Sequence, residues 1–245
     1  LISICMMVKD EERNLPRTLN ALKPLLEKSD VELIIVDTGS SDRSPEIAKE
    51  FTDKVYFHQW NRHFSEMRNI SISYARGEFL FILDADEMLL NPDDLYKVIK
   101  ENRNSKFNTM ALKIRNLNIT GGYTTISQMR IFRNDGEFRY EGAVHNQPKF
   151  KHPILDIDVV LEHYGYLFYD EEFRKKKFER TAGILIDELK KNPNNIYYRY
   201  QLSKSYRANR DKENALIEIR KAYQLVTGDK ELRKRYSYIY GSYAS

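Results

Sequence analysis

The feature that most constrains this chain is the alternation of short apolar runs with helical patterns over its first hundred residues. Four runs have the length and composition of buried strands: 2–8, 31–36, 54–57 and 78–83. Between the first two, leucines recur at helical spacing from Leu15 to Leu26. Ser44-Pro45 and Asn91-Pro92 carry the polar cap and first-turn proline that begin helices. Strands that alternate with helices form a mostly parallel sheet with helices on both faces, so we expect an α/β fold.

The pattern changes after about residue 105. Alternating apolar and polar residues predict further strands over 109–114, 127–132 and 158–162. The chain then becomes helical, and six residues there follow the spacing of half a tetratricopeptide pattern: Leu202, Ser203, Tyr206, Ala215, Ile219 and Ala222. An ordinary helical hairpin is the alternative. One repeat cannot bury its own face, so we expect an α/β domain over 1–170 and an incomplete helical-repeat tail over 171–245.

Charge is divided unevenly between these two parts. The tail holds 18 basic and 10 acidic residues, a net charge of +8, whereas the first 170 residues carry −4. An acidic first part argues against a nucleic-acid partner, which would require a dominant basic surface. The apolar runs are too short to span a bilayer, and no signal-peptide pattern is present. Because the single cysteine, Cys5, lies in a predicted buried strand, we expect a cytoplasmic protein without disulfides.

Carboxylates follow three of the predicted strands. Ligands of open α/β sheets bind beyond the carboxyl ends of the strands. The acids at these ends are Asp10 and Glu11 after the first strand, Asp37 after the second, and Asp84 and Asp86 after the fourth. A solvated loop would explain any one of them, but together they indicate a site for hydroxyls, amides or a metal ion. Residues two apart in an extended chain point the same way, so Asp84 and Asp86 would suit a hard cation such as Mg²⁺ or Mn²⁺.

A second Asp-x-Asp pair, Asp156 and Asp158, lies inside a later strand between apolar neighbours. Chance alone gives roughly one such pair in a chain of this composition, so the spacing by itself carries no weight. We therefore expect Asp84 and Asp86 to belong to a site, and the later pair to be structural. Glycine-rich phosphate loops of the Walker or dinucleotide type do not occur in the sequence, which argues against ATPases and dehydrogenases.

Four stretches of the chain occur in an order that resembles the family 2 glycosyltransferases with a GT-A fold: ISICMMVKDEE, LIIVDTGSSD, FSEMRN and FLFILDADE. The resemblance covers about residues 2–170. Within the family, the chain is most similar to the bacterial branch of peptide S-glycosyltransferases that modify bacteriocins. The shared features are Trp60-Asn61, Met129-Arg130-Ile131-Phe132-Arg133, Val144-His145, His163-x-Gly165 and a helical-repeat tail. Related lipopolysaccharide-core glucosyltransferases share several of them, which leaves the acceptor class open.

This resemblance implies roles for individual residues. The implied nucleotide-sugar site comprises Val8, Lys9, Asp10, Glu11, Asp37, Arg68, Asp84 and Ala85. Asp86 and His163 are implied as ligands of Mg²⁺ or Mn²⁺. The family inverts the anomeric centre, so a general base must deprotonate the acceptor. Glu141 and His145 are the two candidates for this base.

Three functions are open at this stage, and we rank them in order. The first is an inverting, metal-dependent transferase that moves a hexose, glucose by resemblance, from a UDP-sugar to a Cys or Ser/Thr of a peptide. Its tail would bind the peptide or form a homodimer. The second acts on a lipopolysaccharide or lipid-linked acceptor, with the basic tail at an anionic membrane surface. The third is a non-catalytic repeat scaffold that retains a transferase-like domain.

Overall fold

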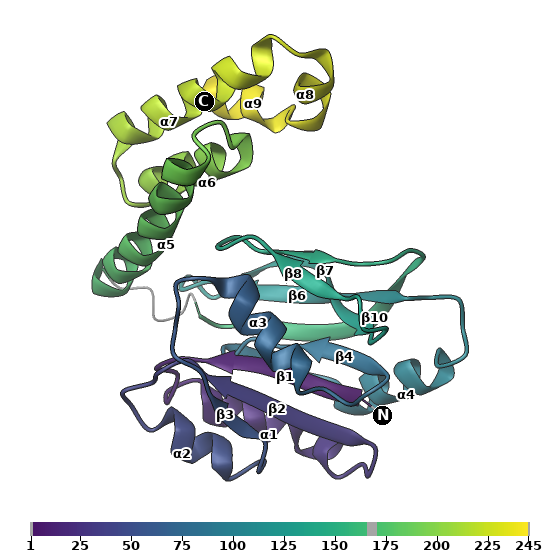
Figure 1. The fold of residues 1–245 in the computed structure, drawn as a ribbon. Coiled ribbons are helices and arrows are strands. Elements are labelled where there is room, and N and C mark those ends of the chain that lie inside the picture. Colours follow the sequence, from purple (N-terminus) through teal and green to yellow (C-terminus); the bar gives the residue numbers. More distant parts are fainter. Residues whose placement is uncertain (1, 166–170, 245) are drawn as a thin grey trace. The chain divides into compact units, whose positions relative to one another are not determined.

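The structure, a computed structural model, describes residues 2–165 and 171–244 (Figure 1). The described chain divides into two compact units. Residues 2–142 and 146–165 form an α/β unit, and residues 143–145 and 171–244 form a helical unit. The boundary expected between residues 170 and 171 falls beside the segment 166–170, which lies outside the described residues. The short loop 143–145 groups with the helices, although the sequence analysis counted it with the α/β part.

An eight-stranded sheet forms the centre of the α/β unit, with strand order β3-β2-β1-β4-β7-β6-β10-β5. Its strands are β1 (Ile2–Val8), β2 (Val31–Asp37), β3 (Val55–Phe57), β4 (Phe79–Ile82), β5 (Glu87–Leu89), β6 (Thr109–Leu117), β7 (Tyr123–Arg133) and β10 (Ile154–His163). β7 runs antiparallel to both of its neighbours and β5 runs antiparallel to β10, whereas the other neighbours are parallel. A separate two-stranded sheet joins β8 (Arg139–Glu141) and β9 (Gln147–Lys149). The predicted mostly parallel α/β fold is confirmed.

Helices cover both faces of the sheet, because its central strands are apolar on both sides. Ile4 and Met6 of β1 belong to the core cluster on one face, and Cys5 belongs to the cluster on the other. The first face packs against α1 (Leu15–Leu26), α2 (Ser44–Lys49) and α4 (Pro92–Glu101), and the second against α3 (Phe64–Ser73) and β8 (Figure 1). Burial raises the pKa of the Cys5 thiol, so this cysteine is a core residue.

A polar network fixes the amino ends of β1 and β2. Glu32 accepts hydrogen bonds from Ser3 Oγ at 2.5 Å and from the Arg76 amide at 2.7 Å, and it pairs with Lys54. Burial would raise the pKa of Glu32, but the hydrogen bonds from Lys54, Ser3 and the Arg76 amide outweigh it and lower that pKa. A Cβ on Gly77 would lie 2.6 Å from both the amide nitrogen and Oγ of Ser3, so only glycine fits there.

Five helices make up the described part of the helical unit: α5 (Glu171–Lys191), α6 (Ile196–Ala208), α7 (Lys212–Thr227), α8 (Lys230–Arg235) and α9 (Tyr238–Ala244). α6 and α7 carry the tetratricopeptide-like spacing. Ser203, which stands at the usual glycine position, donates to the Ala215 carbonyl at 2.7 Å. Arg199, which stands at the usual tryptophan position, binds Glu218 at 2.6 Å. Both departures from the pattern are thus compensated by polar contacts. Over residues 2–165 and 171–244, no helix is long and apolar enough to cross a membrane.

Candidate functional site

The loops that follow β1 and β2 are hydrogen-bonded to each other at the carboxyl edge of the sheet. Asp10 Oδ1 accepts from the amide of Ser41 at 2.7 Å and from its hydroxyl at 3.0 Å. The amide of Glu11 donates to Ser44 Oγ at 2.8 Å. Lys9 is exposed at the start of the first loop. The structure therefore brings together the ends of two strands that the sequence analysis singled out separately.

Asp37 and Val8 shape the turn that follows β2. Asp37 is 5% exposed, and its Oδ1 accepts from the amides of Gly39 at 3.0 Å and Ser40 at 3.1 Å. Gly39 has a φ of +100°, which glycine adopts without strain. The carbonyl of Val8 accepts from the Thr38 amide at 2.9 Å and from the Thr38 hydroxyl at 3.1 Å. These contacts hold the turn's backbone in a fixed position beside the first loop.

Asp84 lies two residues after the end of β4, between two arginines. Arg68 Nη2 lies 2.6 Å from Asp84 Oδ1, and both terminal nitrogens of Arg130 lie 3.2 Å from Oδ2. The neighbouring Ala85 is buried, and its carbonyl accepts from Thr18 Oγ1 at 2.7 Å. The loop after β4 is thus anchored through its backbone at Ala85 and through its carboxylate at Asp84.

The same arginine also pairs with Glu87, a buried acid to which the sequence analysis gave no role. Arg130 bonds Glu87 Oε1, and Glu87 Oε2 accepts from the Asp84 amide at 3.0 Å. Burial would raise the pKa of Asp84, but the charges of Arg68 and Arg130 outweigh it and hold that pKa well below its usual range. Burial raises the pKa of Glu87 to about 7; Arg130 opposes this shift and the charge of Asp84 adds to it. Asp84 is therefore the fixed negative charge of this cluster.

A β-bulge directs Arg130 to this position. Met110 pairs with Ile131, but the next residue, Ala111, pairs with Met129, so Arg130 is the extra residue of β7. A bulge turns one side chain away from the regular alternation of a strand. The sequence analysis placed Arg130 in a shared motif without a role. The available signal was an arginine inside an apolar strand, because a buried cation requires a partner.

The pattern FSEMRN is explained by helix α3, whose polar side chains bind β8 and the loop after it. Ser65 Oγ donates to the Gly142 carbonyl at 2.6 Å. Asn69 donates to the Tyr140 carbonyl at 3.0 Å and accepts from the Tyr140 amide at 2.8 Å. Arg68 lies on the same helix and reaches Asp84 instead. Residues three and four apart share a helix face. Ser65 and Asn69 therefore hold the β8 region, while Arg68 on the same stretch of helix reaches Asp84.

Asp86 and His163 form a pair at the end of β10. His163 Nε2 lies 3.0 Å from Asp86 Oδ2, and its Nδ1 lies 2.9 Å from the side-chain oxygen of Asn116. A Cβ on Gly165 would lie 2.1 Å from Asp86 Oδ2 and 3.1 Å from His163 Nε2, which explains the His-x-Gly pattern. Burial alone would lower the pKa of His163, but its hydrogen bond with Asp86 and the nearby negative charges outweigh it and raise that pKa.

These two residues fit a divalent ion whose coordination a substrate phosphate would complete. No group of three or more His, Cys, Asp or Glu able to hold a metal occurs within the part of the chain that the structure describes. Mg²⁺, however, usually retains waters and binds one or two carboxylates together with substrate phosphates. Asp86 and His163 supply such a partial set, and Asn116 orients the imidazole as an outer partner does. The carboxylate of Asp84 is instead paired with Arg68 and Arg130.

A cavity of about 560 Å³ begins beside Asp84 and runs within the α/β unit between β8–β9 and strands β6, β7 and β10. Three of its lining residues carry a buried side-chain nitrogen with no hydrogen-bond partner among the described residues: Arg68 Nε, Arg130 Nε and Asn146 Nδ2. Buried donors in native proteins are normally satisfied. The cavity therefore suits a ligand rich in oxygen atoms, such as a sugar or a phosphate.

Asp156 lines this cavity, although the sequence favours a structural role for it. Asp158, two residues along the strand, has a side chain that is 87% exposed and pairs with Lys113 at 2.6 Å. The two acids of the second Asp-x-Asp pair thus differ in environment, although their spacing is the same as that of Asp84 and Asp86.

The two base candidates lie elsewhere. Glu141 is exposed, and its carboxylate pairs with Arg139 at 2.9 Å and Lys149 at 3.1 Å. The hydrogen bonds from Lys149 and Arg139 lower its pKa. His145 groups with the helical unit and has a φ of 49°. Burial and the charges of two nearby lysines lower the pKa of His145 to about 4. Neither residue lines the cavity beside Asp84.

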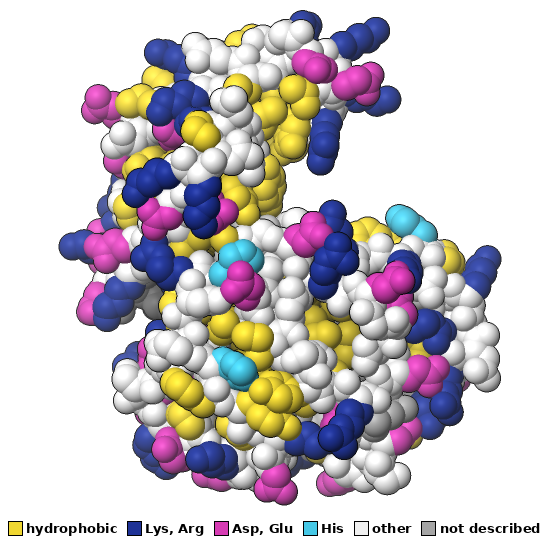
Figure 2. All heavy atoms as spheres, viewed as in Figure 1, with side chains coloured by type: hydrophobic (Ala, Val, Ile, Leu, Met, Phe, Trp, Pro, Cys, Tyr) yellow, Lys and Arg dark blue, Asp and Glu magenta, His cyan; other side chains and the backbone are white. Residues whose placement is uncertain are grey.

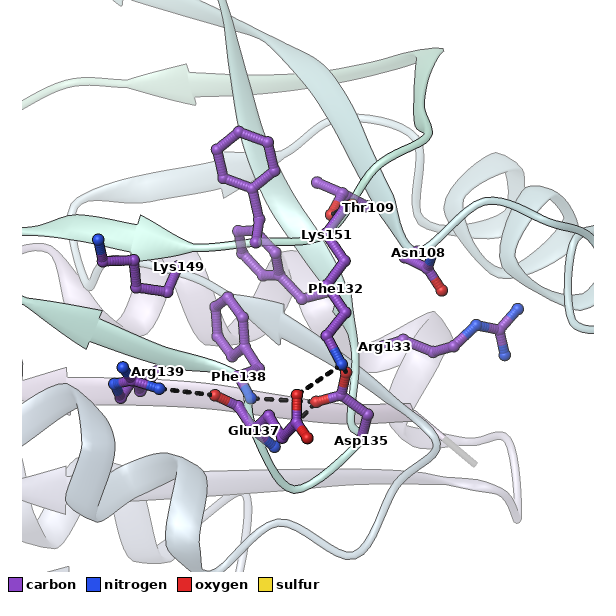
Figure 3. A pocket seen from close by; sticks show the side chains of 11 residues that line it. Asn108, Thr109, Phe132, Arg133, Asp135, Glu137, Phe138, Arg139, Lys149 and Lys151 are labelled. Carbon is purple, nitrogen blue, oxygen red and sulfur yellow. Dashed lines mark hydrogen bonds and ion pairs between the residues drawn. The ribbon is translucent and has the colours of Figure 1, made fainter.

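A smaller hollow of about 180 Å³ lies at the opposite, amino edge of the parallel strands (Figure 3). The rings of Phe132 and Phe138 stack with their centroids 4.1 Å apart. Lys151 lies 2.6 Å from Asp135 and 2.8 Å from Glu137 (Figure 3). The charged side chains of Lys151, Asp135 and Glu137 in the wall of the hollow are thus paired with one another. Because ligands of such sheets bind at the carboxyl edge, we interpret this hollow as a feature of the packing and not as a ligand site.

Comparison with known proteins agrees with this geometry. Residues 3–151 match the sequence profile described as Glycosyl transferase family 2. The chain belongs to this family. The family 2 chain is 30% identical over 178 residues to the TPR repeat-containing protein Synpcc7942_0270 of Synechococcus elongatus, a match that covers 67% of the chain and 42% of the relative. It is 25% identical over 201 residues to the SPbeta prophage-derived glycosyltransferase SunS of Bacillus subtilis, which covers 79% of the chain and 46% of SunS.

Among solved structures, the family 2 chain is similar to TarS 1–349 of S. aureus in complex with UDP-GlcNAc. That match has a TM-score of 0.54 at 12% identity and covers 95% of the chain and 83% of TarS 1–349, so it shows a shared fold. The chain spans less than half the length of the two curated relatives named above. The α/β unit is accordingly a glycosyltransferase domain, and one of the relatives is named as a TPR repeat-containing protein.

Proposed function

We propose that this chain carries the catalytic domain of a cytoplasmic, inverting, metal-dependent glycosyltransferase. It moves a hexose, glucose in our proposal, from a UDP-sugar to a Cys or Ser/Thr of a peptide. The binding of the sugar donor is supported above all by the Asp86–His163 pair. Beside it lies Asp84, whose carboxylate is paired with two arginines. Membership of family 2 supports the reaction class. The UDP-GlcNAc complex of the similar TarS structure supports a uridine nucleotide as the donor.

The nucleoside of the donor would bind at the joined loops after β1 and β2. Lys9, Asp10 and Glu11 lie in the first loop, and Asp37 fixes the backbone of the second. The exposed side chains of Lys9 and Asp10 offer polar groups that could form hydrogen bonds with a base and a ribose. Val8 and Ala85 contribute through backbone position, because both side chains are buried.

The diphosphate would lie at the Asp86–His163 pair, and Mg²⁺ or Mn²⁺ is the ion that we propose there. When bound, such an ion would neutralise charge on the departing diphosphate. Asp86 and His163 would hold it, and Asn116 orients the histidine ring. Arg68, which has a buried Nε without a partner among the described residues, is placed to donate to a phosphate or sugar oxygen.

The helical unit offers a face on which a peptide could lie. Tyr197, Tyr200 and Lys204 lie along α6, and the Tyr200 and Tyr238 rings are 4.6 Å apart. Lys204 Nζ lies 5.6 Å from the centre of the Tyr200 ring. On the side shown in Figure 2, hydrophobic side chains, a class that includes tyrosine, are exposed between basic ones over these helices. Aromatic rings beside cations suit the mixed apolar and polar surface of a peptide. A homodimer through the same helices is the other role that we propose for them.

A mass-spectrometric screen of UDP-sugars against peptides that contain Cys, Ser or Thr tests donor and acceptor together. We expect one hexose to be added to a peptide by the wild type and none by Asp86→Ala, with the circular dichroism spectrum unchanged. Asp93→Ala is the matched control, because the Asp93 side chain is 75% exposed and pairs with Lys28 at 3.4 Å. Normal transfer by Asp86→Ala would overturn the proposal. Transfer to lipid-linked acceptors alone would move the protein to the second function.

A further inference from the structure

Asp156 lines the cavity from β10, the strand next to the edge strand β5. It pairs with Ala111 of β6, and Ala111 pairs in turn with Met129 of β7. Side chains of directly paired residues project from the same face of a sheet. All three residues line the cavity, so they form one row across its wall. Met129 is followed by Arg130, which binds Asp84. The row therefore begins beside the donor cluster, by which we mean Asp84, Arg68 and Arg130, and it ends at Asp156.

Among the residues that the structure describes, no cation forms an ion pair with the carboxylate of Asp156. Its hydrogen bond comes from Ser127 Oγ at 3.3 Å. The other acid that lines the cavity, Asp84, is paired with both Arg68 and Arg130. Among the described residues of the cavity wall, Asp156 is thus the acid that retains oxygen atoms able to accept a proton or a hydrogen bond from a ligand.

The size of the cavity fits a small ligand. Neighbouring strands lie about 4.8 Å apart, so two strand spacings place Asp156 roughly 10 Å from the Met129 position beside the donor cluster. The cavity volume of about 560 Å³ lies within the range of about 300–1,000 Å³ found for small-ligand sites.

We propose that Asp156 is the general base that deprotonates the acceptor, and this proposal rests on the proposed function. The acceptor's S–H or O–H proton passes to the Asp156 carboxylate while its sulfur or oxygen forms a bond to the anomeric carbon. The bond between that carbon and the diphosphate oxygen breaks, and UDP leaves with the electron pair. Atoms and charges balance without a further reactant.

The two bases favoured by the sequence are less suitable. The carboxylate of Glu141 is occupied by two cations, and it lies outside the cavity wall. His145 belongs to the helical unit and does not line the cavity either. Asp156 combines a position in the wall with an unneutralised carboxylate. Its substitution should also spare the fold, because the residue is exposed.

The test compares Asp156→Asn with Asp158→Asn, a matched change two residues along the same strand. The substrate is UDP-glucose with Mn²⁺ and no peptide, so the acceptor is water and the release of UDP is measured. A positioned base contributes about 10²–10⁴-fold, so we expect kcat to fall at least about 100-fold in Asp156→Asn. The affinity for UDP, measured by calorimetry, should be unchanged in both variants, and Asp158→Asn should turn over like the wild type.

A rescue experiment separates a base from a residue that only supports the cavity. In Asp156→Ala, added formate can enter the vacated space and accept the proton, so turnover should rise with formate concentration. The proposal is overturned if Asp156→Asn retains wild-type turnover, if it loses UDP affinity, or if formate restores nothing. If the wild type itself neither binds UDP nor turns over any UDP-sugar, the proposed function fails first, and this inference fails with it.

Discussion

Replacing Gly165 by alanine tests the proposed metal site at its tightest point. An added Cβ would lie 2.1 Å from Asp86 Oδ2, whereas real Cβ contacts essentially never fall below 3.0 Å, so the carboxylate must move by about 1 Å. The obstacle is the end of a side chain rather than backbone, so the fold survives and the Asp86–His163 pair is displaced. Loss of such support typically lowers metal affinity 10–100-fold, which corresponds to about 1.4–2.7 kcal/mol.

The assay is calorimetric titration of Mn²⁺ in the presence of UDP. Gly228→Ala is the control, because an added Cβ there would meet nothing within 4 Å. Stability is followed by urea unfolding with the fluorescence of Trp60, the single tryptophan of the sequence, which reports on the α/β unit. We expect weaker Mn²⁺ binding with nearly unchanged unfolding in Gly165→Ala alone. An affinity within twofold of the wild type would refute the reasoning.

Two further changes test the charges of the α/β unit by the same unfolding assay. Arg130→Met should lower the free energy of unfolding by about 3–5 kcal/mol, because it leaves Glu87 buried without its cation. The double variant with Glu87→Leu should recover most of that loss, and a single variant as stable as the wild type would contradict the ion-pair account. Glu32→Gln should cost about 1–3 kcal/mol at neutral pH. Folding lowers the pKa of Glu32. The stability difference between Glu32→Gln and the wild type should therefore be full above the pKa of an unfolded Glu, about 4.3, and should shrink as the pH falls below it. A stability difference that does not change with pH would count against the network around Glu32.

The α/β class could be predicted from sequence because burial leaves a direct trace in the chain. β1 and β2 read as mostly apolar runs, interrupted near their amino ends by Ser3 and Glu32, since helices cover both faces of the sheet. The order of the strands leaves no such trace. β7 lies between β4 and β6 and runs antiparallel to both, and that placement depends on contacts between residues far apart in sequence.

The candidate site was predictable only where it follows strand ends. Asp84 and Asp86 stood out for that reason, whereas Arg130 and Asp156 lie inside strands. The role of Arg130 depends on a bulge that appears only in the pairing register. Asp156 faces a cavity because its row crosses three strands, and a count of Asp-x-Asp pairs along one strand contains no information about that row.

The loop Ala143–His145 means that the chain changes unit three times: after residue 142, after residue 145, and between residues 165 and 171. Within the helical unit, the Ala143 amide donates to the Tyr198 hydroxyl at 3.0 Å, and the Tyr197 hydroxyl donates to the His145 carbonyl at 3.3 Å. The loop and the tail therefore form one structural unit, although they are separate in sequence, and we expect them to be inherited together. Recombination that exchanged the tail alone would leave the loop without these partners. In chimaeras between relatives, the tail should be accepted only together with its matching three-residue loop.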